Sequence, residues 1–267
     1  MTAIALTIAG SDSGGGAGIQ ADIKTFSALG VYGCSVIAAL TAQNTLGVTG
    51  IHDVPADFVA AQMDAVFSDI AVDAVKIGML SQPEVIETVA AKLVEYEVEK
   101  IVLDPVMVAA SGDPLLADEA VASIRDTLMP LASVVTPNLF EAARLLDTEV
   151  AETVEAMDRQ AEAFLALGAK AVLLKGGHGT GSESDDLLVS AGSRLWFSAP
   201  RHPTANTHGT GCTLSSAIAA GLAKGQSLQD AVAAAKTYIS AAIAAADQLA
   251  IGRGHGPVHH FHHFWNS

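Results

Sequence analysis

The chain has 267 residues, half of them apolar, and its 14 basic and 29 acidic residues give a formal net charge of −15. This length and apolar content predict a folded chain with a sizeable core and exclude a disordered one. The excess negative charge repels phosphate groups, so we expect neither nucleic-acid binding nor attachment to an anionic membrane. No repeat, low-complexity linker or charge block divides the sequence, which predicts one domain over residues 1–267.

Two features of the sequence bear on the compartment. The uncharged stretch 26–51 is interrupted by glycines and by the polar run Gln43–Thr45, so it does not supply the ~20 mostly apolar residues of a spanning helix. The N-terminal segment Met1–Leu6 lacks the basic region of a signal peptide. Without an export signal, the two cysteines, Cys34 and Cys212, are expected to be reduced thiols in a cytoplasmic protein.

Short apolar runs recur along the chain, and each is followed by a turn and an amphipathic stretch. Their continuous apolar character predicts parallel strands that are covered on both faces. The runs are Ile4–Ala9, Val36–Leu40, Val75–Leu80, Ile101–Leu103, Val134–Thr136 and Val172–Leu174.

The segments between these runs carry helix signals. Ser81–Glu84 has the spacing of a capping box, and Asp57 is placed to cap a helix over Phe58–Phe67. The Ala-rich stretch Thr213–Leu249 predicts two helices separated near Gly225. Strands that alternate with helices predict an α/β fold, in which ligands bind at the loops after the carboxyl ends of the strands.

Two glycine-containing loops follow predicted strands. The loop Ser11–Gly18 matches neither the dinucleotide fingerprint nor the Walker A motif, and it fits a ligand-binding loop and a tight strand-to-helix turn equally well. The mismatch to the fingerprint disfavours a Rossmann dehydrogenase. The loop Lys175–Gly179 places a lysine beside flexible backbone, which suits a nucleotide phosphate, although a solvated surface lysine is the commoner outcome for such a loop.

The segment Asn206–Thr213 carries the sharpest signal, because an apolar helix follows it directly. Gly209 and Gly211 are therefore expected at a helix N-terminus, where free N–H groups and the helix dipole form an anion site. Cys212 falls in the first helical turn, where the pKa of a thiol tends to be lowered. A small buried cysteine is the commoner fate of a free thiol, but the preceding loop favours a proton-accepting one.

Polar side chains follow two neighbouring predicted strands. Asp104 comes directly after one, and Asn138 and Glu141 come after the next. Two carboxylates at adjacent strand ends can hold a Mg²⁺, directly or through water, whereas either alone is better explained as a helix cap. Beside a lysine and an anion loop they indicate phosphoryl transfer, which depends on positioning and charge neutralisation.

The run His259–His263 near the C-terminus looks like a metal-binding tract. It has no Cys or carboxylate partner nearby, and aromatic residues are interleaved with the histidines. We therefore expect a surface or docking segment and no metal site there.

Together these motifs resemble a known family. Asn206–Cys212 is similar to the anion-hole signature of the ribokinase superfamily, and Cys212, where sugar kinases carry Asp, is similar to the hydroxymethylpyrimidine/phosphomethylpyrimidine kinase branch. The resemblance covers nearly the whole chain. The other matching segments are Ala9–Asp12, Gly15–Asp22, Thr41–Thr45, Lys76–Leu80, Asp104–Met107, Thr136–Asn138, Lys175–His178 and Gly256–His262.

The resemblance implies a ribokinase-like fold, a central and mostly parallel sheet flanked by helices, commonly as a homodimer. It implies Mg²⁺-dependent transfer of the γ-phosphoryl group of ATP to 4-amino-5-hydroxymethyl-2-methylpyrimidine and then to its monophosphate, in thiamine biosynthesis. The implied roles are substrate binding for Gln43, Gly10, Asp22, Met79 and Val106; catalysis for Cys212, Gly209, Gly211 and Lys175; nucleotide binding for Asn138, Glu141, Lys175 and Thr207; and metal binding for Asp104 and Glu141.

Three points concern function within this resemblance. A loose phosphoryl-transfer transition state needs little early proton removal, so we expect the amides of Gly209 and Gly211 to matter more than the Cys212 thiol. A pyridoxal or pyridoxine kinase is an alternative, which Gln43 disfavours as the main activity. A non-catalytic ligand-binding module is another, which the presence of Lys175 and Glu141 disfavours.

Overall fold

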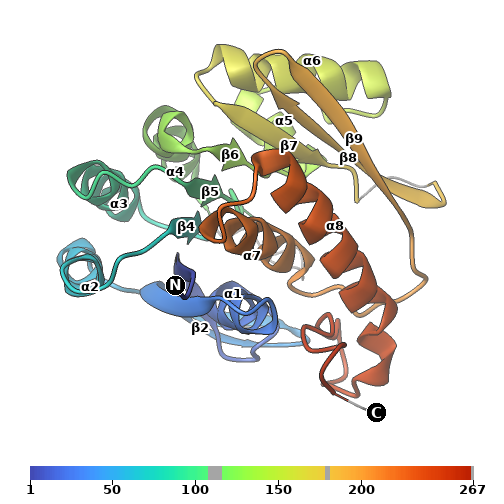
Figure 1. Ribbon diagram of the computed structural model, residues 1–267, viewed down its shortest axis with the longest axis horizontal. Helices are drawn as coiled ribbons and strands as arrows, with labels where there is room; N and C mark the ends of the chain where they lie inside the picture. Colours follow the sequence, from blue (N-terminus) through green and yellow to red (C-terminus); the bar gives the residue numbers. More distant parts are fainter. Residues whose placement is uncertain (108–115, 178–180, 266–267) are drawn as a thin grey trace.

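The structure is a computed structural model that describes residues 1–107, 116–177 and 181–265 (Figure 1). Its strands are β1 (Ile4–Asp12), β2 (Tyr32–Asn44), β3 (Gly47–Asp53), β4 (Ala74–Ile77), β5 (Ile101–Leu103), β6 (Val134–Val135), β7 (Ala171–Lys175), β8 (Glu183–Ser190) and β9 (Ser193–Pro200). Its α-helices are α1 (Gly18–Ala28), α2 (Ala56–Phe67), α3 (Pro83–Glu95), α4 (Asp118–Ser123), α5 (Leu139–Leu146), α6 (Val154–Ala166), α7 (Thr210–Ala223) and α8 (Leu228–Ala244).

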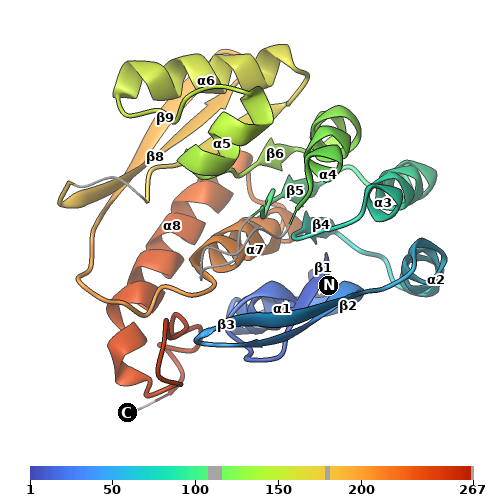
Figure 2. The same cartoon turned by 180° about the vertical axis from the view of Figure 1, so that it is seen from behind.

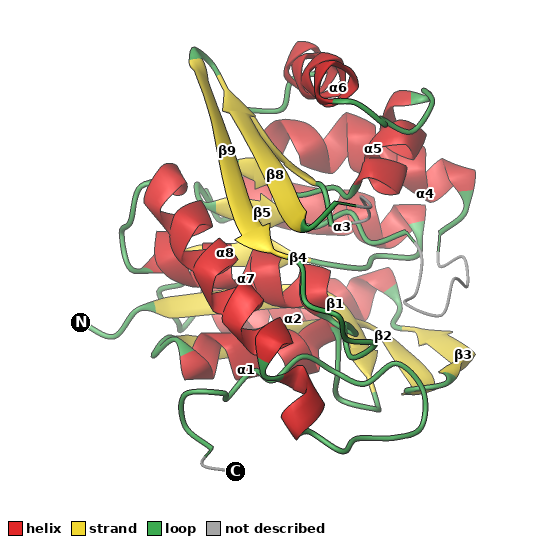
Figure 3. Cartoon of the chain, turned by 90° about the vertical axis from the view of Figure 1, so that its right-hand side faces the viewer, coloured by secondary structure: helices red, strands yellow, loops and turns green. Residues whose placement is uncertain are grey.

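Within the described ranges the strands form one nine-stranded sheet in the order β3-β2-β1-β4-β5-β6-β7-β8-β9. The central strands β2, β1, β4, β5, β6 and β7 pair in parallel, and β3, β8 and β9 pair antiparallel at the two edges (Figure 3). The chain leaves β1 toward β2 and later returns to β4 on the other side of β1. This reversal is the switch point at which doubly wound sheets open a crevice for ligands.

Helices cover both faces of the sheet (Figures 1 and 2). Ile101 and Leu103 of β5 belong to a core shared with α2 to α6, whereas Val102 belongs to a core shared with α1, α7 and α8. Strands buried on both faces are apolar at consecutive positions, which is why their sequence runs do not alternate.

The anion loop, Asn206–Thr213, runs into the N-terminus of helix α7, and this helix is buried along most of its length. It packs on the sheet and contacts α1 and α8. Its small residues allow this close approach, since a Cβ placed on Gly221 would lie only 2.8 Å from the Cβ of Ala231 in α8. A helix held on several sides gives the loop at its start a fixed position.

The structure confirms the six predicted strands and the two helices on either side of Gly225, which has φ +80°. Both predicted caps are wrong. The N-cap of α3 is Gln82 and that of α2 is Pro55, neither with a side-chain capping bond, because the Ser81 hydroxyl donates to Asp53 instead and Asp57 lies inside the first turn.

Strands β3, β8 and β9 had no counterpart among the predicted runs. β8 contains the short buried apolar run Leu187–Val189, which the sequence analysis missed, whereas β3 and β9 contain no buried apolar run. β9 alternates between half-buried and exposed positions, and β3 is largely exposed at the sheet edge. Among the described residues, no helix has both the length and the apolar character needed to cross a membrane.

Candidate active site

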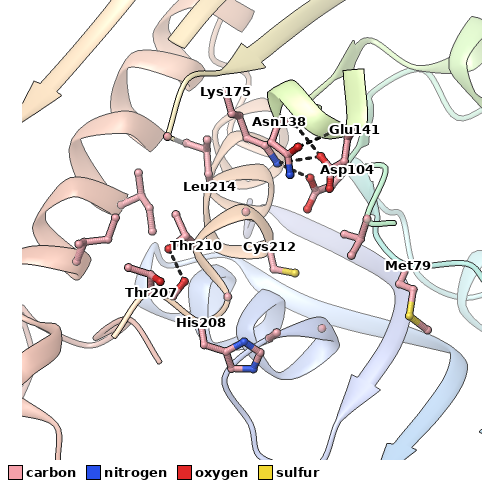
Figure 4. A pocket seen from close by; sticks show the side chains of 18 of the residues that line it. Met79, Asp104, Asn138, Glu141, Lys175, Thr207, His208, Thr210, Cys212 and Leu214 are labelled. Carbon is pink, nitrogen blue, oxygen red and sulfur yellow. Dashed lines mark hydrogen bonds and ion pairs between the residues drawn. The ribbon is translucent and has the colours of Figure 1, made fainter. Parts of the chain in front are cut away.

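The carboxyl ends of the parallel strands border a cavity of about 940 Å³ (Figure 4). It extends from the end of β1 across the N-terminus of α7 to α8. Nearly all of the site residues suggested by the sequence line it, namely Gly10, Gln43, Met79, Asp104, Val106, Asn138, Glu141, Lys175, Thr207, Gly209, Gly211 and Cys212. His178, which belongs to the Lys175 loop motif, lies outside the described residues.

A buried charge cluster lies at the ends of β5 and β7. Lys175 Nζ is 2.9 Å from Asp104 Oδ1 and 3.9 Å from Glu141 Oε2. Burial acts to raise the pKa of Asp104, but the ammonium groups of Lys175 and Lys76 outweigh it and hold that pKa below its ordinary value. Asp104 therefore stays ionised, and it also accepts a hydrogen bond from Ser215 of α7. The cluster combines a fixed cation with fixed carboxylates beside the anion loop.

Asn138 and Glu141 form the capping box of α5. The Glu141 N–H donates to Asn138 Oδ1 (2.9 Å), and the Asn138 N–H donates to Glu141 Oε2 (2.7 Å). Burial raises the pKa of Glu141 to about 7, against the lowering effect of Lys175. Asn138 and Glu141 thus do cap a helix. The same hydrogen bonds hold the Glu141 carboxyl group beside Lys175.

The raised pKa of Glu141 predicts a stability change with pH. Between about pH 4.5 and 7 the folded chain holds a proton that the unfolded chain has released, so the free energy of unfolding falls as the pH rises through this window. This fall amounts to about 3 kcal/mol in the free energy of unfolding, and we expect Glu141→Gln to abolish it. Urea unfolding at both ends of the window measures it, with the exposed Glu87→Gln as the matched control. Equal pH dependence in wild type and Glu141→Gln would refute the assignment.

The anion loop is held by close backbone contacts. Gly209 is the N-cap of α7 in a left-handed conformation (φ +81°), and a Cβ there would overlap the carbonyl oxygen of Gly16. A Cβ on Gly211 would lie 3.2 Å from Lys175 Nζ. In the first turn of α7 the Thr210 N–H donates to the Thr207 carbonyl oxygen (3.2 Å). The N–H groups of Gly211 and Cys212 have no helical acceptor in the described chain, so these two are available to an anion next to the lysine.

Cys212 lies in the first turn of α7, between the charge cluster and His208 (Figure 4). The predicted lowering of its pKa is wrong. Burial raises the pKa of the thiol to about 11, although the Lys76 ammonium and the Gly18 N–H act to lower it. Desolvation of the thiolate outweighs the helix N-terminus, so the group is a protonated thiol near neutral pH.

We therefore expect Cys212→Ala to keep kcat within about tenfold of wild type, because a loose transition state gains little from early proton removal. Steady-state kinetics measures the effect, and Cys34→Ala, which changes the other free cysteine, is the control. Loss of all turnover with intact folding and ATP binding would contradict this.

Asp22, for which the resemblance implied substrate binding, is not among the residues that line the cavity. Its side chain is fully buried and accepts from Thr7 (2.6 Å), Ser216 (2.6 Å) and Lys76 (3.0 Å), joining β1, α7 and β4 to α1. Lys76 borders the cavity, although its side chain is as fully buried as that of Asp22, and its ammonium interacts electrostatically with Cys212 and Asp104. The ion pair is thus internal to the fold, and Lys76 acts on the site through its charge.

The first glycine loop is a tight turn built around Asp12. The Asp12 carboxylate accepts the N–H groups of Gly14, Gly16 and Ala17 at 2.8–3.0 Å and is 2.8 Å from His208 Nε2. The sequence fitted a ligand-binding loop and a tight turn equally well, and the tight turn accounts for Gly14 and Gly16. The contact between Asp12 and His208 joins this turn to the anion loop. Asp12 and His208 were missed as positioning residues because they are 196 positions apart in sequence.

A second buried pair borders the cavity at α8. Lys236 Nζ is 2.7 Å from Asp186 Oδ2, and Asp186 Oδ1 accepts the Gly176 N–H (3.0 Å). This contact fixes the backbone next to Lys175. No sequence signal singled out Lys236, which lies on an Ala-rich helix with no motif around it.

The His-rich segment docks on α7 and α8. His260 is buried with Nε2 3.0 Å from Thr213 Oγ1, and the Tyr238 hydroxyl donates to the His260 carbonyl (2.7 Å). In the described part of the chain no three His, Cys, Asp or Glu residues are grouped to hold a metal. His259 and His260 are buried, so the segment packs against the body of the chain, and it supports the anion loop through the Val258 N–H bond to His208 O (3.3 Å).

Comparison with known proteins identifies the family. Residues 12–259 match the family model described as phosphomethylpyrimidine kinase. The chain is 61% identical over 265 residues to the hydroxymethylpyrimidine/phosphomethylpyrimidine kinase of Rhizobium meliloti, with 99% of each chain covered.

Solved structures agree with this and with the ribokinase-like α/β fold expected from the sequence. The phosphomethylpyrimidine kinase of Clostridium difficile 630 is 46% identical with a TM-score of 0.80, over 90% of this chain and 99% of that one. The Bacillus subtilis pyridoxal kinase, solved with ADP, is 37% identical with a TM-score of 0.92 over all of both chains. On this evidence, the chain belongs to the phosphomethylpyrimidine kinase family.

Proposed function

We propose that the protein is an ATP-dependent kinase that phosphorylates 4-amino-5-hydroxymethyl-2-methylpyrimidine and then its monophosphate, in thiamine biosynthesis. One observation carries the proposal: Lys175, Asp104 and the N-terminus of α7 meet in a single cavity of about 940 Å³. The full-length identity of 61% to the Rhizobium meliloti kinase supports the substrate.

The residues divide the work of the first step. The substrate hydroxymethyl oxygen forms a bond to the γ-phosphorus as the bond from that phosphorus to the β,γ-bridging oxygen breaks, and ADP leaves. The hydroxyl proton passes late to an oxygen of the transferred phosphoryl group, which releases it to water. Lys175 and the first-turn N–H groups around Gly211 neutralise charge on the transferred group. Gln43, Gly10, Met79 and Val106 hold the ring. In the second step, a phosphate oxygen of the monophosphate takes the place of the hydroxyl oxygen.

Asp104 and Glu141 fit a Mg²⁺ site. Mg²⁺ keeps several waters and needs only one or two carboxylates together with substrate phosphates. Both side chains lie beside Lys175 in the cavity, and Asn138 completes the polar edge. Bound Mg²⁺ would supply charge neutralisation at the phosphates. Glu141 and Asp104 would hold it, and Asn138, Lys175 and Thr207 would bind the nucleotide.

The proposal extends to the organisation of the protein. We place a single catalytic domain over residues 1–267 in the cytoplasm, where Cys34 and Cys212 stay free thiols. We expect a homodimer, for whose interface the exposed apolar side chains Leu40, Ile51 and Phe58 are candidates. Sedimentation of the purified protein tests the dimer.

The function is tested by incubating the protein with Mg-ATP and, in parallel, with the hydroxymethylpyrimidine, its monophosphate, and pyridoxal. Formation of the pyrimidine monophosphate and diphosphate, followed by mass, is the expected result. Turnover of pyridoxal alone would move the function to the second candidate, which the similarity to the pyridoxal kinase of Bacillus subtilis favours. Absence of ADP in all three reactions would refute the kinase assignment for these substrates.

A further inference from the structure

The backbone of Gln43 is fixed at the mouth of the cavity. The Ser13 hydroxyl donates to the Gln43 carbonyl oxygen (2.8 Å) and accepts the Gln43 N–H (2.9 Å). The β2–β3 pairing shifts register between Ala42 and Gln43, so this residue stands at an irregularity in the strand. Gln43 and Thr41 both line the cavity. The backbone contacts therefore fix the position from which the Gln43 side chain extends into the cavity, and its amide lies against Thr41.

The Thr41 hydroxyl decides the orientation of that amide. Its Oγ1 lies 2.8 Å from the Ser11 carbonyl oxygen and 3.0 Å from the oxygen end of the Gln43 amide. A hydroxyl has one proton and a carbonyl oxygen can only accept, so the proton cannot satisfy both contacts. Whichever oxygen is left without it would face another oxygen at hydrogen-bond distance. The two ends of an amide have almost the same shape, and their identity follows from such networks.

Turning the Gln43 amide by 180° satisfies every contact. The Thr41 proton goes to the Ser11 carbonyl oxygen, and Thr41 Oγ1 accepts an N–H from Gln43 Nε2. We infer that Thr41 is a positioning residue that holds the Gln43 amide in this orientation, which leaves its carbonyl oxygen and its second N–H to the ligand. The Ser11 carbonyl provides the fixed reference, since it belongs to the backbone of β1.

This orientation distinguishes the 4-aminopyrimidine from pyridoxal, two rings that carry the same reacting hydroxymethyl group. The inference rests on the proposed function. A 4-aminopyrimidine presents an N–H donor and a ring-nitrogen acceptor side by side, which complements an amide oxygen and N–H. Pyridoxal instead presents an aldehyde oxygen and a phenolic oxygen. The opposite amide orientation, with both N–H groups free, would complement those oxygens. Thr41 thus favours the aminopyrimidine over pyridoxal.

The test combines substitution of Thr41 with removal of the substrate amine, in the manner of a double-mutant cycle. Wild type, Thr41→Val and Thr41→Ser are assayed with the hydroxymethylpyrimidine, with its analogue in which the amine is a methyl group, and with pyridoxal. In wild type, losing the amine lowers kcat/KM by about a hundredfold. In Thr41→Val that factor shrinks about tenfold through KM, and pyridoxal gains about tenfold relative to the aminopyrimidine. Thr41→Ser keeps the hydroxyl and the wild-type ratios.

The outcomes separate this inference from the proposed function. A wild-type enzyme that phosphorylates the pyrimidine, with unchanged ratios in Thr41→Val or an equal loss on all three compounds, would overturn the role of Thr41 alone. Failure of wild type to phosphorylate the pyrimidine would overturn the function. In that case, calorimetric binding of the pyrimidine and its methyl analogue to the same variants still measures the amide orientation, because it needs no turnover. Thermal unfolding checks that Thr41→Val is folded.

Discussion

Lys175→Met is expected to lower kcat/KM for ATP by about 10²–10³-fold, the largest loss we expect from a single side chain in this protein. Lys175 Nζ is the cation of the charge cluster, 2.9 Å from Asp104 and next to Gly211 at the anion loop. Phosphoryl transfer depends on neutralising charge in place, and methionine keeps the length of the side chain without its charge. Steady-state kinetics with varied ATP measures the loss.

Two variants separate the charge from its surroundings. Lys170→Met removes an exposed lysine that precedes β7 and should leave kinetics unchanged. Removing Lys175 alone leaves the buried Asp104 without its ion-pair partner at 2.9 Å, with only the more distant charge of Lys76, which by itself destabilises the site. In the double variant Lys175→Met with Asp104→Asn, stability should recover while activity stays low. Activity within threefold of wild type in Lys175→Met would contradict the role.

Gly209→Ala is expected to lower activity by at least about a hundredfold. The left-handed backbone at φ +81° costs a non-glycine residue about 1–2 kcal/mol, and the new Cβ overlaps the Gly16 carbonyl oxygen. The anion loop must then move away from the first glycine loop. A displacement of about 1 Å is enough to cost about 10²-fold in rate, because the loop positions the transferred group. Kinetics and thermal unfolding of the same sample measure both effects.

Gly225→Ala is the matched control, because Gly225 has the same left-handed backbone (φ +80°) with no atom within 4 Å of an added Cβ. It should show the strain of about 1–2 kcal/mol and keep full activity. If Gly209→Ala were as stable as Gly225→Ala and fully active, the close packing of the two glycine loops would have no part in catalysis.

These variants also rank the groups at the anion loop. A large loss from Gly209→Ala beside a small one from Cys212→Ala would place the catalytic effect in backbone position and charge. The pKa of about 11 for the Cys212 thiol agrees with that ranking. The reverse order would make proton transfer to a Cys212 thiolate the important event.

The sequence alone determined the parallel core of the sheet and the loops that carry the chemistry. Buried strands such as Ile101–Leu103 are continuous apolar runs, and a strand end followed by glycine or a carboxylate marks a loop at the ligand edge. The edge strands β3 and β9 could not be predicted in this way, because exposed strands need no apolar run. The resemblance added which residues come together at the site. Asp22 departs from it, because its carboxyl group pairs with Lys76 inside the fold.

How those residues act on one another depends on contacts that form only in the folded chain. The pKa of Cys212 depends on burial, which no local pattern reveals, and desolvation there outweighs the effect of the helix N-terminus. The contacts from Asp12 to His208 and from Lys236 to Asp186 join residues far apart in the chain, so no spacing predicts them. The orientation of the Gln43 amide follows from the acceptor that receives the Thr41 hydroxyl proton. Ser11 of β1 meets Thr41 and Gln43 of β2 only because the two strands pair.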